Sequence, residues 1–236
     1  MSKDEEKRIV QILNRLKSAY PQAKVALRYG SSWELLVAVV LSAQCTDVMV
    51  NKVTEKLFVK YKTLDAYVRA DPKEFEQDIK STGFYHNKAK NVLAAAKLVK
   101  EKFKGRVPDT MEELLTLPGV ARKTANIILG NAYNVVVGIA VDTHVGRISQ
   151  RLRLVDLASI GGKKELTFTK GEKTIVDFKK DADPVRIEQA LMATIPKDQW
   201  FGVTYRIVDH GRAICKSQNP MCTACMLKDL CPASRV

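Results

Sequence analysis

The stretch from Leu117 to Arg147 constrains the fold of this chain more than any other part of the sequence. It opens with a Leu-Pro-Gly-Val turn signal, continues with apolar residues at helical spacing, and ends on Asp-Thr-His, which predicts the start of another helix. Gly119 accepts a positive φ without steric cost, and Pro118 fixes the approach to the turn. The stretch therefore predicts a hairpin that joins a helix at roughly 111–115 to a second helix beginning near Arg122.

The backbone of this hairpin is a candidate anion site. The N–H groups of Gly119 to Ala121 are expected to point outward at a helix N-terminus, where they can bind phosphate without side-chain charge. An ordinary turn between two helices has the same sequence signature, so the motif by itself favours neither interpretation.

Lys123 and Asp142 are the candidate reactive groups. Lys123 lies in the first turn of the second helix, where the helix dipole disfavours a cation and so favours the neutral amine that Schiff-base chemistry uses. A solvated or phosphate-binding lysine is the alternative. Asp142 has the position of an N-cap for a helix over 143–152, and the intervening chain is long enough to return it to Lys123, although it need not do so. A capping carboxylate can also steer proton transfers.

At these residues the sequence resembles the endonuclease III family, the bifunctional DNA glycosylases of the helix-hairpin-helix superfamily. The matching motifs are Leu-Pro-Gly-Val-Ala-Arg-Lys-Thr-Ala-Asn at 117–126 and Val-Asp-Thr-His at 141–144. The resemblance implies that Lys123 is the nucleophile and Asp142 its partner. It implies removal of oxidised pyrimidines from duplex DNA, followed by β-elimination 3′ to the abasic site. It also assigns DNA contacts to Leu117, Gly119, Val120, Ala121, Arg122 and His144.

Gln44 and Phe84 are candidates for entering the DNA. From spacing alone, Gln44 is a solvated residue of a loop between two helices. Its Ser-Ala-Gln-x-Thr-Asp context also occurs in the family, and the resemblance implies that Gln44 fills the gap left by a flipped nucleotide. Phe84 follows Gly83 on a turn, where the family usually has a leucine-like residue. It is either an apolar wedge between bases or an aromatic residue buried under the loop.

Four of the five cysteines form a cluster near the end of the chain. Six, two and five residues separate Cys215, Cys222, Cys225 and Cys231. Four thiolates select zinc or an iron–sulfur cluster, and zinc sites usually have two paired Cys-x-x-Cys units, whereas only one such pair occurs here. The resemblance implies a structural [4Fe–4S] cluster that holds the loop 216–221 and presents Lys216 to a phosphate. Cys45 lies outside the pattern.

The charge of the chain and its apolar runs limit its partners. A formal net charge of +13 predicts a polyanionic partner, most commonly nucleic acid. The charged first residues contain no apolar signal core, and the longest apolar runs are too short to cross a bilayer. We therefore expect a cytoplasmic, nucleoid-associated monomer without membrane contact, which acts on double-stranded DNA with a damaged base or an abasic site.

Helical patterns dominate and predict an all-α fold. The resemblance implies two helical lobes with DNA in the cleft between them: 24–136, which contains the hairpin, and 1–23 with 137–236, which ends in the cysteine loop. The exception is an insertion at 156–183, where alternation around Lys-Gly-Glu predicts a small β-hairpin near 165–178. This connection is longer than is usual in the family. It is either an extension of the DNA-binding face or a solvated decoration.

Two other functions compete with this interpretation. A monofunctional glycosylase of the same superfamily, such as the adenine-mismatch type, generally lacks the hairpin lysine. A non-catalytic DNA-binding module with a zinc site would bind through charge and the hairpin without cutting. One departure from the family pattern is Ala121, where glycine is frequent. Alanine there costs about 1 kcal/mol or more if the residue needs a positive φ, and little if it is helical.

Overall fold

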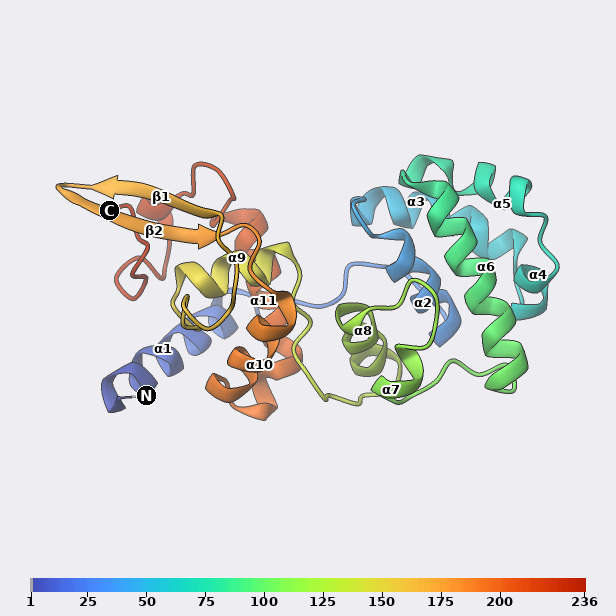
Figure 1. The fold of residues 1–236 in the computed structure, drawn as a ribbon, viewed down its shortest axis with the longest axis horizontal. Coiled ribbons are helices and arrows are strands. Elements are labelled where there is room, and N and C mark those ends of the chain that lie inside the picture. Colours follow the sequence, from blue (N-terminus) through green and yellow to red (C-terminus); the bar gives the residue numbers. More distant parts are fainter. Residues whose placement is uncertain (1) are drawn as a thin grey trace. The chain divides into compact units, whose positions relative to one another are not determined.

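The chain folds as two compact units in the computed structural model, which describes residues 2–236. One unit comprises the chain up to Lys24 together with Gly138–Val236, and the other is the continuous segment Val25–Val137. Both units are helical, and a single two-stranded sheet is present among the described residues (Figure 1). The predicted all-α fold with a small β-hairpin is therefore confirmed. No helix within residues 2–236 has the length and apolar character needed to cross a bilayer.

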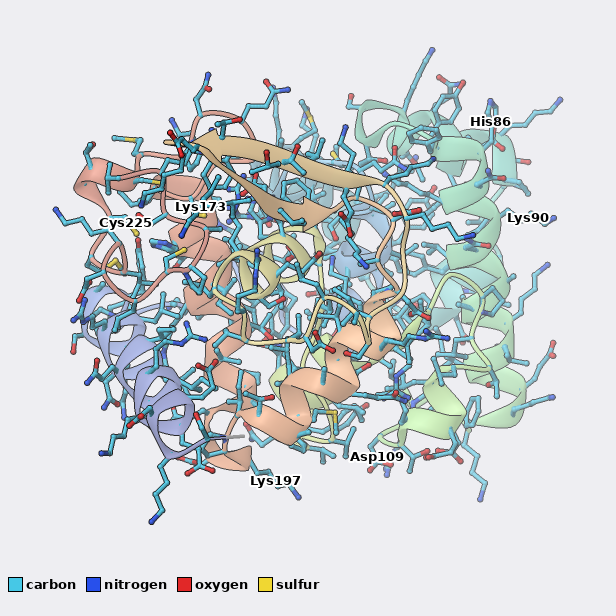
Figure 2. All side chains as sticks on the ribbon, turned by 60° about the vertical axis from the view of Figure 1, so that its left-hand side comes forward. His86, Lys90, Asp109, Lys173, Lys197 and Cys225 are labelled. Atoms are coloured by element: carbon cyan, nitrogen blue, oxygen red, sulfur yellow. The ribbon has the colours of Figure 1, made fainter. Side chains whose placement is uncertain are left out.

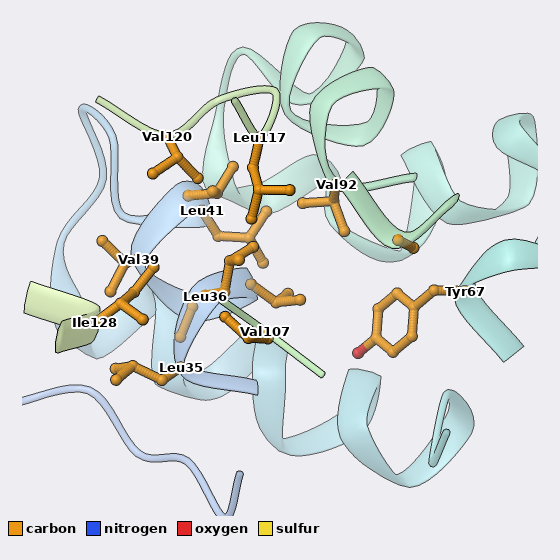
Figure 3. Packing of buried hydrophobic residues seen from close by; sticks show 14 of the residues in the cluster. Leu35, Leu36, Val39, Leu41, Tyr67, Val92, Val107, Leu117, Val120 and Ile128 are labelled. Atoms are coloured by element: carbon orange, nitrogen blue, oxygen red, sulfur yellow. The ribbon is translucent and has the colours of Figure 1, made fainter. Parts of the chain in front are cut away.

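The continuous unit is built around α2 (Ser32–Leu41), in which every residue from Leu35 to Leu41 is buried. A helix that is apolar all round must be surrounded, and α3, α6 and α8 pack against it (Figure 1). Figure 3 shows side chains of α2 meeting those of the hairpin and of Val92 on α6. The helical elements of this unit are α2, α3 (Asp47–Lys60), α4 (Leu64–Val68), α5 (Pro72–Asp78), η1 (Lys80–Thr82), α6 (Tyr85–Lys102), α7 (Met111–Leu114) and α8 (Arg122–Ala132).

Most helices of this unit begin at a side chain that accepts a backbone N–H. The capping residues of α2, α3, α4, α5 and α7 are Ser31, Thr46, Thr63, Asp71 and Thr110. Within the part of the chain that the structure describes, α6 and α8 begin without such a cap, at Phe84 and Ala121. The first N–H groups of these two helices therefore lack the usual side-chain acceptor.

The discontinuous unit joins the N-terminal helix to the second half of the chain. Helix α11 packs against both α1 and α9, and its Gly211 allows the close approach of α9, because a Cβ at that position would lie 2.8 Å from His144 Cδ2. Its elements are α1 (Lys3–Ala19), α9 (Thr143–Arg151), β1 (Glu165–Lys170), β2 (Lys173–Lys179), α10 (Pro184–Thr194), η2 (Lys197–Gln199), α11 (Trp200–Ala213) and η3 (Cys222–Ala224).

The β-hairpin lies within the predicted insertion. Strands β1 and β2 pair antiparallel from Glu165↔Lys179 to Lys170↔Lys173, with an irregular register after Leu166. Gly171 has a φ of +59°, as a two-residue hairpin turn requires. The hairpin packs against α9, and its Asp177 is 3% exposed. The insertion is thus anchored to the unit by a buried carboxylate.

Candidate functional site

The turn between α7 and α8 has the geometry that its sequence predicts. Gly119 adopts a φ of +80°, and a Cβ at this position would lie 3.0 Å from Asn91 Cβ. The side chains of Leu117 and Val120, on either side of it, are buried in the core of the continuous unit (Figure 3). These apolar side chains therefore anchor the turn in the core, while Gly119 itself is exposed.

The amides of the turn differ from one another. Val120 N–H donates to Leu117 O at 3.1 Å, so the expectation that this amide points outward is wrong, because the turn itself uses it. Ala121 is exposed and extended, with a φ of −103°, and it precedes α8 as its N-cap. It is not helical, yet it needs no positive φ, so alanine causes no backbone strain here.

Lys123 lies on the first turn of α8, directly after Arg122. Its side chain is half-buried, and the structure records no ion pair for it among residues 2–236. Lys123 therefore lies at the start of a helix, as the sequence predicts.

Asp142 caps α9, as its sequence position predicts. Its Oδ1 accepts hydrogen bonds from the backbone N–H groups of His144 and Val145, both at 2.8 Å. Its Oδ2 lies 3.2 Å from His144 Nδ1. The carboxylate is half-buried, and one of its two oxygens serves the cap while the other faces an imidazole. Capping therefore orients the carboxylate so that Oδ2 faces the imidazole of His144.

Gln44 and Phe84 are both exposed and have a positive φ, as do Lys104, Asn134 and Asn219. Gln44 lies in the loop between α2 and α3 with a φ of +53°, and Phe84 precedes α6 with a φ of +48°. Both side chains are exposed, and Phe84 is 64% exposed. The alternative of an aromatic residue buried under the loop is therefore wrong for Phe84. Non-glycine residues with positive φ persist only where the surrounding structure imposes them, and such positions often belong to functional sites.

Lys88 is a residue that the sequence analysis did not single out. It is buried on the first turn of α6, and its Nζ donates to Leu41 O at 2.8 Å and to Thr82 O at 2.7 Å. A signal was present in the sequence: Lys88 precedes Val92 by four residues, which puts it on the apolar face of the helix.

The four clustered cysteines line a single cavity with Arg151 and His210 in the discontinuous unit. Figure 2 labels Cys225 among the sulfur atoms of this region. None of the five cysteines is in a disulfide. No three histidine, cysteine or acidic groups within residues 2–236 converge so that they could hold a single ion. The structure thus brings together four soft donors of the kind that bind zinc or iron–sulfur clusters.

Arg151 fixes the loop that follows the first of these cysteines. Its guanidinium donates to Lys216 O at 2.7 Å and Ser217 O at 2.9 Å, and it lies 3.4 Å from Cys215 Sγ. The Lys216 side chain is exposed while its carbonyl is held. The loop is thus positioned by its backbone, with the lysine left available to solvent or a ligand.

A two-unit helical fold with a glycine-turned helical hairpin and a capping Asp-Thr-His motif defines a helix-hairpin-helix repair protein. Residues 37–170 match the family model described as HhH-GPD superfamily base excision DNA repair protein. The endonuclease III of Synechocystis sp. is 45% identical over 230 residues, covering 98% of this chain and 94% of that protein. The endonuclease III of Bacillus subtilis is 39% identical, with coverage of 95% and 92%.

Solved structures agree with these relatives. A non-covalent endonuclease III–DNA complex is 39% identical with a TM-score of 0.84, covering 98% of this chain and 96% of that one. A trapped endonuclease III–DNA covalent intermediate has the same identity and TM-score. The chain belongs to the endonuclease III family. It is an enzyme of base-excision repair, a DNA glycosylase and AP lyase, and the resemblance seen in its motifs is confirmed.

Proposed function

We propose that this enzyme removes oxidised pyrimidines from double-stranded DNA through a Schiff base at Lys123 and then cuts the strand 3′ to the abasic site. The observation that carries the proposal is the half-buried Lys123 on the first turn of α8, directly after a turn that presents its backbone. Membership of a family with a trapped covalent DNA intermediate supports the same chemistry.

The Lys123 amine, in its neutral form, attacks the sugar C1′, and the bond from C1′ to the base breaks with proton transfer to the leaving base. Opening of the sugar ring gives the Schiff base. Loss of a proton from C2′ then breaks the C3′–O bond, which is the β-elimination. Asp142 assists the proton transfers and stabilises the cationic sugar through Oδ2, since its Oδ1 is held by two amides.

The same proposal assigns the DNA contacts. The amides of Gly119 and Ala121 bind phosphate at the uncapped start of α8. Leu117 and Val120 support the turn through their buried side chains. Polar contacts to the DNA backbone come from Arg122, His144 and Lys216. The gap left by the flipped nucleotide is filled by Gln44 and Phe84. The enzyme acts as a monomer in the cytoplasm, associated with the nucleoid.

Cys215, Cys222, Cys225 and Cys231 would hold a [4Fe–4S] cluster, which supplies structural cross-linking of the loop rather than a step of the reaction. The shared cavity of the four thiols supports this ligand set. Metal content and visible absorption of anaerobically purified protein test it. Stoichiometric iron with broad absorption is expected, and colourless protein with stoichiometric zinc would rule the cluster out.

Borohydride trapping on a duplex with one abasic site tests the nucleophile. Wild type is expected to form a covalent adduct and Lys123→Gln to form none, because only the amine can give a reducible Schiff base. Lys90→Gln is the matched control, since Lys90 is an exposed lysine on α6 of the same unit (Figure 2). An adduct with Lys123→Gln would move the chemistry to another amine. No adduct with any protein, with DNA binding intact, would favour a monofunctional glycosylase.

A further inference from the structure

Lys88 is a buried cation that uses main-chain carbonyls as its partners. Its side chain is 5% exposed on the first turn of α6. The ammonium donates to Leu41 O at 2.8 Å and to Thr82 O at 2.7 Å. Burial lowers the pKa of Lys88 below the usual lysine value, and the nearby Cys45 opposes that shift. The two carbonyls are the hydrogen-bond acceptors that a buried ammonium needs.

The two carbonyls come from the ends of two different elements. Leu41 is the last residue of α2, and Thr82 is the last residue of η1. Carbonyls at helix C-termini lack intrahelical partners and are favourable places for a cation. The Lys88 ammonium therefore binds the C-terminal ends of two helices that are far apart in sequence.

An exposed residue follows each of these two helix ends within three positions. Gln44 follows Leu41 by three positions, and Phe84 follows Thr82 by two. Both protruding residues are exposed and have positive φ. Such backbone geometry is unfavourable for non-glycine residues unless the flanking structure imposes it. Lys88 binds the flanking backbone on both sides, and its own N–H donates to Phe84 O at 3.2 Å.

We propose that Lys88 is a positioning residue that holds Gln44 and Phe84 at a fixed separation, so that both enter the damaged duplex as one rigid unit. The proposal rests on the function proposed above for Gln44 and Phe84 and adds the residue through which they act together. It differs from a purely structural role for Lys88, which would lower all activities in parallel.

The decisive variant is Lys88→Met, which keeps the length of the side chain and removes the charged donor. The exposed Lys90→Met, two residues along α6, is the matched control. Single-turnover excision of a damaged base from duplex DNA is compared with cleavage of an abasic site in single-stranded DNA, where no base pair has to be opened. We expect Lys88→Met to slow duplex excision about tenfold. Single-strand cleavage should stay within about twofold of wild type.

A mutant cycle separates positioning from general stability. In a Gln44→Ala, Phe84→Ala background, adding Lys88→Met should cause no further loss of duplex excision, because the residues that it positions are already absent. A further loss of about tenfold in that background would overturn the proposal. So would an equal loss on duplex and single-stranded substrates. If Lys88→Met does not fold, Lys88→Gln replaces it, with an intermediate loss expected on the duplex only.

The two proposals fail in different ways. If wild type forms no borohydride adduct, the function proposed for Lys123 is wrong. If wild type is trapped normally and Lys88→Met excises as fast as Lys90→Met, only the positioning role of Lys88 is wrong.

Discussion

Two independent constraints require a glycine at position 119. Its φ of +80° lies in the left-handed region, and a Cβ there would also meet Asn91 Cβ at 3.0 Å. The first constraint comes from the turn and was visible in the sequence. The second comes from the packing of α6 against the hairpin and was not.

Replacing Gly119 with alanine should destabilise the protein by more than a backbone effect alone. The left-handed conformation costs about 1–2 kcal/mol. Crowding against Asn91 adds about 1 kcal/mol or more. Urea unfolding of Gly119→Ala measures the sum.

Gly171→Ala is the control for this measurement, because Gly171 has a φ of +59° and nothing lies within 4 Å of its Cβ position. It should show the backbone part only. Equal losses in the two variants would mean that the hairpin adjusts around Asn91 without strain.

At the scale of elements, the β1–β2 hairpin is tied to the cysteine loop through one arginine. Asp177 on β2 accepts hydrogen bonds from Arg151 Nε at 2.8 Å and from Arg151 Nη2 at 2.7 Å. Both side chains are almost fully buried. Arg151 in turn holds the carbonyls of Lys216 and Ser217. The insertion is therefore a brace for the loop as well as an addition to the surface.

The variant Asp177→Asn should lower the free energy of unfolding by about 3–5 kcal/mol, because it leaves Arg151 buried without its counter-charge. Urea unfolding measures the loss. With the proposed cluster bound, visible absorption reports on the cysteine loop and should fade faster in air than that of wild type.

Glu165→Gln on the same hairpin is the matched control. Glu165 lies 3.6 Å from Lys179 with its side chain 44% exposed, and exposed pairs contribute under about 1 kcal/mol. A loss no larger for Asp177→Asn than for Glu165→Gln would show that the hairpin does not brace the loop.

At the scale of the whole molecule, the net charge of +13 must dominate encounter with DNA. Each neutralised phosphate releases counterions, so affinity falls with salt by a slope of about 0.9 per contact on a log–log plot. Of the many lysines and arginines that carry this charge, only those that touch phosphate in the complex contribute to the slope of log affinity against log salt.

Fluorescence anisotropy on duplex DNA at increasing salt tests this distribution. The affinity of wild type should fall about 10³-fold between 50 and 200 mM salt if about six phosphates are neutralised. Arg122→Gln should reduce the slope by about one, because Arg122 is a proposed phosphate contact. Lys90→Gln should leave the slope unchanged, and the reverse order for these two variants would move the DNA-binding face away from the hairpin.

The local elements of the site were predictable because each depends on neighbours in sequence. The N-cap at Asp142, the start of α8 and the positive φ of Gly119 follow from residues within one turn of the position. The β-hairpin in the insertion follows from alternation and a glycine turn. The spacing of the four cysteines indicated that they act together, and in the structure they line one cavity.

Sequence by itself determined the family and the helical hairpin, because these are carried by short motifs whose physics is local. Tertiary structure alone decided that Phe84 is exposed, that the Val120 amide is used by its own turn, and that Lys88 is buried. Burial and hydrogen bonding depend on which distant segments meet: Lys88 reaches a carbonyl 47 positions away. No pattern within α6 specifies that contact, since it arises only when α2 and η1 are packed against the helix.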